Sequence, residues 1–167
     1  MHPLEYSLPF IDFSICIPGS NADNSCRAMP ICQDAIYTFP DLSSLIAADK
    51  YDGNSSSHAW TIDQGTPQST NNNGGEVALV LTETNNGTRI SSTKYVHYGS
   101  ITATLKASRW AGVVTAFITM SNIKDEIDWE WPGTKTTEVQ SNFFFEGHVD
   151  CTSAHLPLPY SHHVMPM

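Results

Sequence analysis

Acidic and apolar side chains alternate without interruption along residues 126–131 of this chain. The acids take the even positions and the large apolar residues the odd ones: Glu126, Asp128 and Glu130, then Ile127, Trp129 and Trp131. A period of two places the acids on one face of a β-strand and the apolar side chains on the other. Pro132-Gly133 then ends the run with a turn signal. The pattern predicts a strand that presents three carboxyl groups on one face.

The segments on either side of this strand also have extended patterns. Residues 113–120 are apolar and β-branched, and we predict that they pair with residues 123–131 in a hairpin over Ser121-Asn122. After a polar loop, residues 138–143 resume an extended pattern in which Gln140 and Asn142 share one face. Amide side chains both donate and accept hydrogen bonds. The alternative is that this is the polar outer face of an ordinary strand.

The rest of the chain shows short strand patterns separated by turns, and no segment has a convincing helical period. Strands are predicted at residues 36–39, 59–62, 77–82, 88–92 and 95–106, the last with a kink at Gly99. Turns are predicted at residues 71–75 and at Asn85-Asn86-Gly87, a hairpin turn of the Asn-Gly type. Asp41 resembles an N-cap for a short helical turn over residues 41–46. This organisation predicts an all-β sandwich or barrel.

Composition narrows the class of protein and of partner. The 167 residues are 40% hydrophobic and 15% charged, which is typical of one globular domain with a core of its own. No apolar run approaches the ~20 residues of a membrane span. A net charge of −9 argues against nucleic acid as a partner, whereas a neutral polysaccharide is compatible with it. We expect a monomer.

Cysteine spacing favours disulfides over a metal site. Cys16, Cys26 and Cys32 lie among Pro, Asn and Ser with no C-x-x-C pair, so zinc is a poor interpretation. A disulfide within this leader would leave one thiol for Cys151, and the pairing stays open.

Evidence on the cellular compartment is mixed. Sequons begin at Asn54 and Asn86, which would accept N-glycans in a secretory protein, although such triplets also arise by chance. The first residues lack the basic start and apolar core of a signal peptide.

The three clustered acids point to a reaction class. Like charges that are desolvated together raise the pKa of at least one of the group. Glycoside hydrolysis needs one carboxylate that attacks or activates water and one carboxylic acid that protonates the leaving oxygen. The Cα atoms of Glu126 and Glu130 would lie roughly 13 Å apart, whereas a retaining pair needs carboxyl groups about 5 Å apart. The two side chains would therefore have to lean together around Asp128. A solvated edge strand is the alternative.

Three linked blocks carry a resemblance to a known family. Residues 112–118, 125–133 and 139–144, in that order, resemble the catalytic signature of glycoside hydrolase family 16, and within it the fungal cell-wall chitin–glucan transglycosylases. Tyr98-Gly99 with residues 105–107 resembles the block before the catalytic hairpin. The resemblance implies a concanavalin A-like jelly-roll β-sandwich whose concave sheet binds a linear polysaccharide.

The resemblance also implies roles for individual residues. Glu126 would be the nucleophile, Asp128 the assisting residue and Glu130 the acid and then the base. Substrate contacts are expected from Gln140 and Asn142. Trp110 at the cleft rim could stack on a sugar ring, or could equally cap the core edge. Tyr98 is a further expected contact. No cofactor or metal is required.

The resemblance implies a division of the chain and a set of candidate functions. Residues 1–35 are expected to be a leader, residues 36–150 a partial catalytic domain and residues 151–167 a divergent tail, so the jelly roll is expected to be incomplete. The tail contains His155, His162 and His163 without ligands in useful spacing, which disfavours a metal site.

By resemblance the donor is chitin and the acceptor β-glucan, in the cell wall or outside the cell. The alternatives are an endo-β-1,3-glucan hydrolase of the same family and an inactive carbohydrate-binding fragment.

Overall fold

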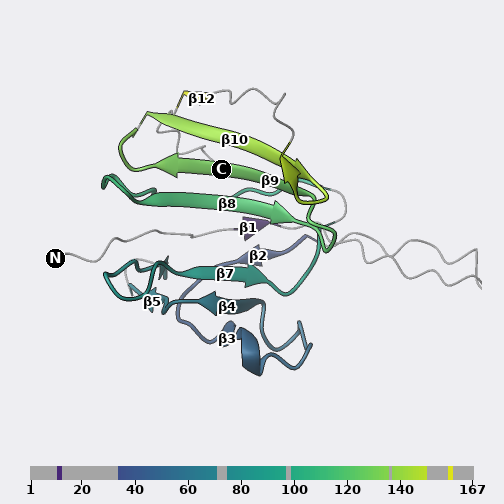
Figure 1. Cartoon of the computed structure of the whole chain (residues 1–167). Helices are drawn as coiled ribbons and strands as arrows, with labels where there is room; N and C mark the ends of the chain where they lie inside the picture. The colour runs from purple at the N-terminus through teal and green to yellow at the C-terminus, as the bar shows by residue number, and fades with distance from the viewer. Residues whose placement is uncertain are drawn as a thin grey trace, which may run out of the picture. The chain divides into compact units, whose positions relative to one another are not determined.

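The computed structural model describes residues 11–12, 34–70, 75–96, 99–135, 137–149 and 158–159. Nearly all of its regular elements are strands, which confirms the predicted all-β class (Figure 1). No helix in the described ranges is long and apolar enough to cross a membrane. The predictions for the four cysteines, for Tyr98 and for the tail histidines concern residues outside the described ranges.

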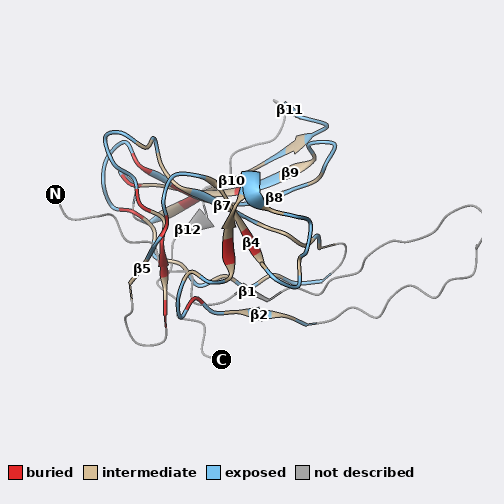
Figure 2. Ribbon diagram, turned by 90° about the horizontal axis from the view of Figure 1, so that it is seen from below, coloured by how far each residue is buried: buried red, intermediate tan, exposed pale blue. Residues whose placement is uncertain are grey.

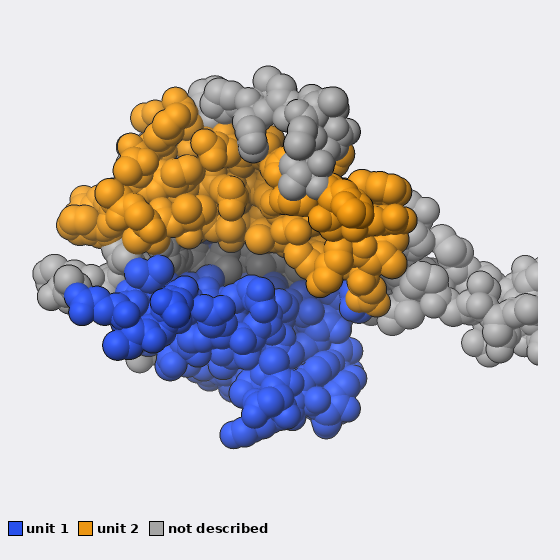
Figure 3. Space-filling view, in the orientation of Figure 1, with its two compact units in different colours: residues 1–106 blue, residues 107–167 orange. Residues whose placement is uncertain are grey.

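The chain divides into two compact units, residues 1–106 and residues 107–167 (Figure 3). The first unit contains three small sheets. Strand β1 (Ile11–Asp12) pairs with β2 (Ile36–Tyr37), β4 (Trp60–Gln64) lies between β3 (Leu45–Ala47) and β7 (Arg89–Ser92), and β5 (Gln68–Ser69) pairs with β6 (Val77–Ala78). A short 3-10 helix, η1 (Ala48–Lys50), follows β3.

Aromatic side chains form the core of the first unit. The ring of Trp60 packs 5.8 Å from that of Phe39 and 5.5 Å from that of Tyr37, centroid to centroid. Phe39 and Val77 are fully buried, and the buried residues are red in Figure 2. Gly75 has a positive φ, and a Cβ there would lie 2.1 Å from the Cα of Pro40. This close approach explains why a glycine stands just before β6.

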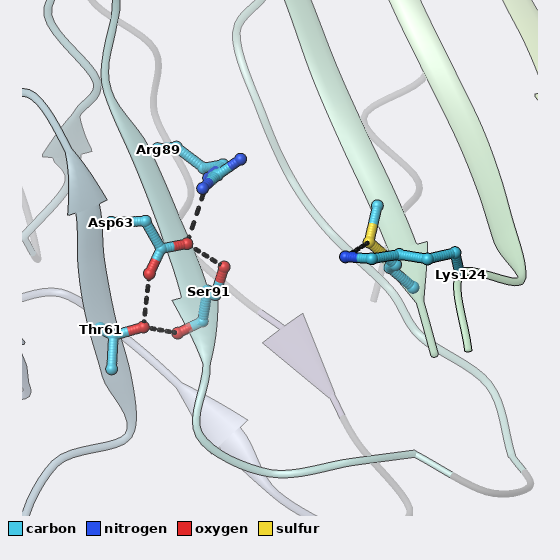
Figure 4. A network of polar contacts seen from close by, with 6 residues as sticks. Thr61, Asp63, Arg89, Ser91 and Lys124 are labelled. Atoms are coloured by element: carbon cyan, nitrogen blue, oxygen red, sulfur yellow. Dashed lines mark hydrogen bonds and ion pairs between the residues drawn. The ribbon is translucent and has the colours of Figure 1, made fainter. Parts of the chain in front are cut away.

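A carboxylate joins β4 to β7 on the other face of that sheet. Asp63 lies where the register between the two strands shifts, and it accepts hydrogen bonds from Thr61 Oγ1, at 2.8 Å, and from Ser91 Oγ (Figure 4). Arg89 Nε lies 3.2 Å from Asp63 Oδ2. The Arg89 side chain is 69% exposed, so this ion pair contributes little stability by itself. The hydroxyl groups of Thr61 and Ser91 satisfy the Asp63 carboxylate, which is less exposed than the Arg89 side chain.

Local turn chemistry decided two of the sequence predictions in this unit. The helical turn predicted at residues 41–46 is confirmed only in part. Asp41 Oδ1 accepts the Ser43 N–H at 2.8 Å, as an N-cap does, and Leu45 N–H donates to Leu42 O at 3.0 Å, but Leu45 then begins a strand that pairs with β4. Hydrogen bonds from Ser43 lower the pKa of Asp41. The hairpin turn predicted at Asn85-Asn86-Gly87 is wrong: Asn86 and Gly87 both have positive φ, but the turn lies at residues 83–85. The strands on either side pair elsewhere, β6 with β5 and β7 with β4.

Three predicted strands are shorter than expected or absent, and the first, residues 36–39, forms only over β2. Residues 77–82 form a strand only over β6, and residues 99–106 contain only an isolated bridge at Ala103. Gly99 has φ 136°, outside the region of extended strands. Alternation of side chains is therefore not sufficient for a strand where the backbone lacks a continuous partner.

The second unit is one antiparallel sheet in the order β11, β10, β9, β8. These strands are β8 (Val114–Met120), β9 (Glu126–Pro132), β10 (Glu138–Phe145) and β11 (His148–Val149), and β12 (Leu158–Pro159) also pairs with β10. The predicted hairpin between β8 and β9 is confirmed, but its loop is longer than two residues. Ser121 N–H donates to Asp125 O at 2.8 Å, and Ile123 is 61% exposed in the turn. Lys124, in the same turn, has its Nζ 3.9 Å from Met120 Sδ (Figure 4).

A buried hydroxyl anchors the segment that leads into β8. Ser108 N–H donates to Thr115 Oγ1 at 3.0 Å, and both residues are buried. We predict that Thr115→Val, which keeps the shape but removes the acceptor, lowers the free energy of unfolding by about 1–3 kcal/mol, because a buried N–H is left without a partner. Denaturant unfolding measures the change.

The control for this change is Thr119→Val on the same face of β8. Within the described part of the chain, the Thr119 hydroxyl forms no hydrogen bond. Equal stability losses at the two positions would contradict the anchoring role of Thr115.

Candidate active site

Strand β9 lies between two partners, and its register decides what surrounds each acid. Residues directly opposite in an antiparallel pair point to the same face. The rows across β8, β9 and β10 are Met120, Glu126 and Phe144; Ile118, Asp128 and Asn142; and Ala116, Glu130 and Gln140. The structure therefore brings all three acids and both amides onto one face, as the period of two predicted. The alternative of an edge strand is wrong, because β9 is paired on both sides.

The apolar residues of β9 lie on the opposite face. Phe117 of β8 packs against Trp129, with ring centroids 6.1 Å apart and planes at 51°. Val139 of β10 is buried on this face, whereas Ile127 near the end of β9 is largely exposed. The packed aromatic pair fixes the middle of the strand, which is the part that carries Asp128 on its other side.

Asp128 is the most buried of the three acids, with 7% of its surface exposed. Burial, followed by a hydrogen bond with the Glu126 carboxyl and by the charge of Glu126, raises the pKa of Asp128 to about 6. The sequence predicted a raised pKa for at least one of the three acids, and this acid is Asp128, the central one. Asp128 Oδ1 is buried and has no hydrogen-bond partner among the described residues.

Aliphatic side chains on β8 complete the acid face, and sequence reasoning did not assign them to it. Ile118 stands directly opposite Asp128, and Val114 and Met120 lie on the same face. All three are substantially exposed, Ile118 by 44%. The period of two in residues 114–120 was a usable signal, but only the register with β9 shows that this stripe borders the acids. The face therefore presents carboxyl, amide and apolar groups together.

Trp110 lies in the loop before β8 and is 54% exposed. The alternative that it caps the core edge is disfavoured by this exposure. The Arg109 guanidinium carbon lies 5.4 Å from the centre of the Trp110 ring. The sequence did not single out Arg109, although a basic residue next to an exposed aromatic residue is a recognisable signal. Tyr98 lies outside the described ranges, so its role stays a prediction.

The described residues contain no group of three or more His, Cys, Asp or Glu side chains that could hold a metal ion. The three acids of β9 are spaced along one strand rather than gathered around a point. Their chemistry is that of carboxyl groups acting on a bound molecule, with one group buried between two more accessible ones.

Comparison with known proteins places the chain in a family. The family model described as "Glycosyl hydrolases family 16" matches residues 54–163. The chain is 40% identical over 123 residues to Crh-like protein 3 of Botryotinia fuckeliana, covering 74% of this chain and 27% of that protein. It is 38% identical over 143 residues to Crh-like protein 2 of Aspergillus fumigatus, covering 85% and 30%.

A third relative, Congo red hypersensitive protein 2 of Saccharomyces cerevisiae, is 33% identical over 141 residues, covering 81% of this chain and 29% of that protein. The chain thus spans less than a third of the length of each of these relatives. No solved structure matches it.

The buried carboxyl makes stability depend on pH. The pKa of Asp128 is about 6 in the folded chain and near 3.8 when unfolded, so between these values the folded chain binds a proton that the unfolded chain lacks. Binding of this proton stabilises the folded chain. The resulting contribution to the free energy of unfolding is present below pH ~4 and is lost as the pH rises through 6. Asp128→Asn removes it. We predict that the stability of the parent relative to Asp128→Asn falls by about 2 kcal/mol between pH 4 and pH 7.

Thermal and denaturant unfolding of both chains across that pH range measure this difference. Asp49→Asn in the exposed helix η1 is the control for loss of one carboxyl group. A difference that does not vary with pH would contradict the raised pKa.

Proposed function

The chain belongs to glycosyl hydrolase family 16, and from this premise we propose that β9 carries the catalytic centre of a retaining glycosidase or transglycosylase for cell-wall β-glycans. The observation that carries the proposal is the row of acids on an internal strand, with Asp128 buried between Glu126 and Glu130. This chemistry needs two accessible carboxyl groups, and Glu126 and Glu130 are the half-buried pair on either side of Asp128. That this chain shares the activity of its longer relatives is part of the same proposal.

The proposed reaction has two displacements. In the first, Glu126 attacks the anomeric carbon while Glu130 protonates the glycosidic oxygen, so the bond to the leaving sugar breaks and a glycosyl ester forms on Glu126. In the second, Glu130 takes a proton from an incoming hydroxyl group, whose oxygen displaces Glu126. Water as the incoming group gives hydrolysis, and a sugar hydroxyl gives transfer.

Asp128 serves this reaction through Glu126. Its raised pKa means that Asp128 holds a proton at mildly acidic pH and can donate it in a hydrogen bond to Glu126. That bond keeps charge on the attacking carboxylate and limits the repulsion between neighbouring acids. The hydrogen bond weakens as the glycosyl ester forms, because the charge on Glu126 is then lost.

The neighbouring polar side chains would bind the sugar. Gln140 and Asn142 lie opposite Glu130 and Asp128 on β10, and their amides can donate to and accept from sugar hydroxyl groups. Trp110 and Tyr98 are proposed as stacking contacts. A neutral glycan suits this face better than an acidic one, because the chain has a net charge of −9.

Chitin as donor and β-glucan as acceptor are the proposed substrates, on the basis of the sequence resemblance to chitin–glucan transglycosylases. We place the protein in the cell wall or outside the cell as a secreted monomeric glycoprotein. The exposure of Asn54 and Asn86, the two sequon residues, supports this, since a glycan needs an accessible side chain. An endo-β-1,3-glucan hydrolase and an inactive carbohydrate-binding fragment remain the alternatives.

Replacing the two outer acids separates their roles. We predict that Glu126→Gln abolishes turnover of chito-oligosaccharides, since no glycosyl ester can form. Glu130→Gln should slow turnover of natural glycans by about 10²- to 10⁴-fold. It should slow an aryl glycoside with an acidic phenol leaving group much less, because such a group departs without protonation. Steady-state kinetics with both substrates measure this.

Glu146→Gln in the exposed turn after β10 is the matched control, because only its backbone N–H forms a hydrogen bond, to Asp125. Turnover that persists in Glu126→Gln would overturn the proposal. Binding without any turnover in the parent chain would favour the carbohydrate-binding fragment.

Product analysis distinguishes transfer from hydrolysis. With chito-oligosaccharide as donor and a fluorescent β-glucan oligosaccharide as acceptor, we predict a fluorescent mixed product whose yield rises with acceptor concentration, because the acceptor competes with water for the glycosyl ester. Chromatography of the labelled products measures it. Release of short β-1,3-glucan products with no mixed product would instead identify the glucan hydrolase.

A further inference from the structure

The row of acids on β9 runs from an apolar end to a polar end. Glu126 stands between Met120 of β8 and Phe144 of β10, whereas Glu130 stands between Ala116 and Gln140. Directly opposite residues share a face of the sheet, so these side chains flank the two carboxyl groups. Met120 is 45% exposed and is therefore accessible to a bound molecule. A sugar with an apolar substituent fits the Glu126 end better than the Glu130 end.

A lysine side chain reaches this apolar end from the turn between β8 and β9. Lys124 Nζ lies 3.9 Å from Met120 Sδ (Figure 4). Because the Met120 side chain is on the acid face, the ammonium group also lies on that face, at the Glu126 end of the row. Lys124 is exposed, and the proposed reaction gives it no role. A thioether is a weak acceptor and an ammonium group has three donors, so donors remain for a ligand.

The backbone of Lys124 is held in an unusual conformation. Its φ is 70°, in the left-handed region that residues other than glycine seldom adopt. Lys124 N–H donates to Ser121 O at 3.1 Å, and Lys124 O accepts the Gly147 N–H at 2.9 Å. Asp125 Oδ1 accepts the Glu146 N–H at 3.0 Å, which ties the same two turns together. Strained residues of this kind persist where the surrounding structure fixes them, and they cluster at functional sites.

The two side chains are complementary to an acetamido group. The carbonyl oxygen of that group accepts hydrogen bonds, and an ammonium group only donates them. The methyl group is apolar, and the flexible thioether of methionine packs against such groups. A sugar hydroxyl in the same place could accept from Lys124 but would cover little of the apolar surface of Met120. This end of the row therefore favours an N-acetylated sugar over its hydroxyl analogue.

We propose that Lys124 and Met120 are specificity-determining residues that bind the acetamido group of the sugar held at the Glu126 end of the acid row. In the proposed reaction, Glu126 attacks the anomeric carbon of the donor sugar and Glu130 protonates the oxygen of the leaving sugar. A contact beside Glu126 is thus made by the donor, and the sugar at the Glu130 end needs no acetamido group. This inference deepens the proposed function and rests on it for the class of ligand, a β-glycan.

Two ligands that differ in one substituent test the inference without interference from turnover. Chito-oligosaccharides and cello-oligosaccharides share the same linkage, but the former carry an acetamido group where the latter carry a hydroxyl group. The Glu126→Gln chain, titrated by calorimetry, should bind the chito-oligosaccharide about 10-fold more tightly. Adding Lys124→Met, which removes the cation and keeps the length, should raise that Kd about 10-fold and leave the Kd for the cello-oligosaccharide within about 2-fold.

Further variants separate the contributions of the two side chains. Met120→Ala should raise the Kd for the chito-oligosaccharide about 3-fold, and Met120→Leu should raise it less, because leucine keeps an apolar surface. Lys124→Arg keeps a cation and should recover part of the loss. Lys50→Met, which removes an exposed cation from η1, is the control for net charge. Thermal unfolding checks that each variant folds.

Kinetics of the chain with Glu126 intact provide a second readout. Lys124→Met should lower the ratio of kcat/KM for the chito-oligosaccharide to that for the cello-oligosaccharide about 10-fold. The acceptor concentration that gives half of the maximal yield of mixed product should stay within about 2-fold, because the acceptor replaces the leaving sugar at the Glu130 end.

The outcomes separate the inference from the proposed reaction. An unchanged Kd for the chito-oligosaccharide in Lys124→Met would overturn the role of the lysine and leave the catalytic assignment intact. Equal increases for both ligands would overturn recognition of the acetamido group, since lost folding or a general contact produces them. Selective weakening in a chain whose turnover does not depend on Glu126 would support the acetamido contact and refute the proposed reaction. A Glu126→Gln chain that binds neither ligand, or both equally, would overturn the inference.

Discussion

Three carboxyl groups on one face of a seven-residue strand repel one another, and the second unit is arranged around that constraint. Water can solvate the outer two, Glu126 and Glu130, which are half-buried. Asp128, in the middle of the row, is buried, with Ile118 and Asn142 opposite it on the two neighbouring strands. Burial, helped by the hydrogen bond with Glu126 and by its charge, raises the pKa of Asp128, and the repulsion is reduced when Asp128 keeps its proton.

The same constraint gives the three acids different chemical properties. A buried carboxyl that retains its proton can donate a hydrogen bond, whereas the outer carboxyls remain accessible to a bound sugar. Pairing on both sides of β9 is essential here, since an edge strand would leave every acid in water and equivalent to the others. The Phe117–Trp129 contact on the reverse face holds the strand in position. The position of the acids in this chain therefore depends on packing on the face that does not carry them.

Contacts of a glycine and of a hydroxyl group also fix the loop before β8, which lies beside the end of β9. Gly133 allows the backbone of Trp110 to approach closely, and Thr115 satisfies the amide of Ser108. Trp110 consequently has a definite position relative to Glu130 along the sheet, although it lies in a loop. The aliphatic stripe on β8 adds apolar surface beside the acids. A surface of carboxyl, amide, aliphatic and aromatic groups matches the mixed polar and C–H character of a sugar polymer.

The sequence by itself determined that Glu126, Asp128 and Glu130 share one strand face, because a period of two is a property of the local backbone and requires no partner. It likewise predicted the hairpin of β8 with β9 and the shared face of Gln140 and Asn142. It failed for residues 95–106, where alternation is present but the described part has no continuous strand.

Only the tertiary structure decided which acid is buried, which side chains stand opposite it, and that Arg109 lies over Trp110. Burial and register depend on pairing between segments that are distant along the chain. Local side-chain alternation contains no information about that pairing.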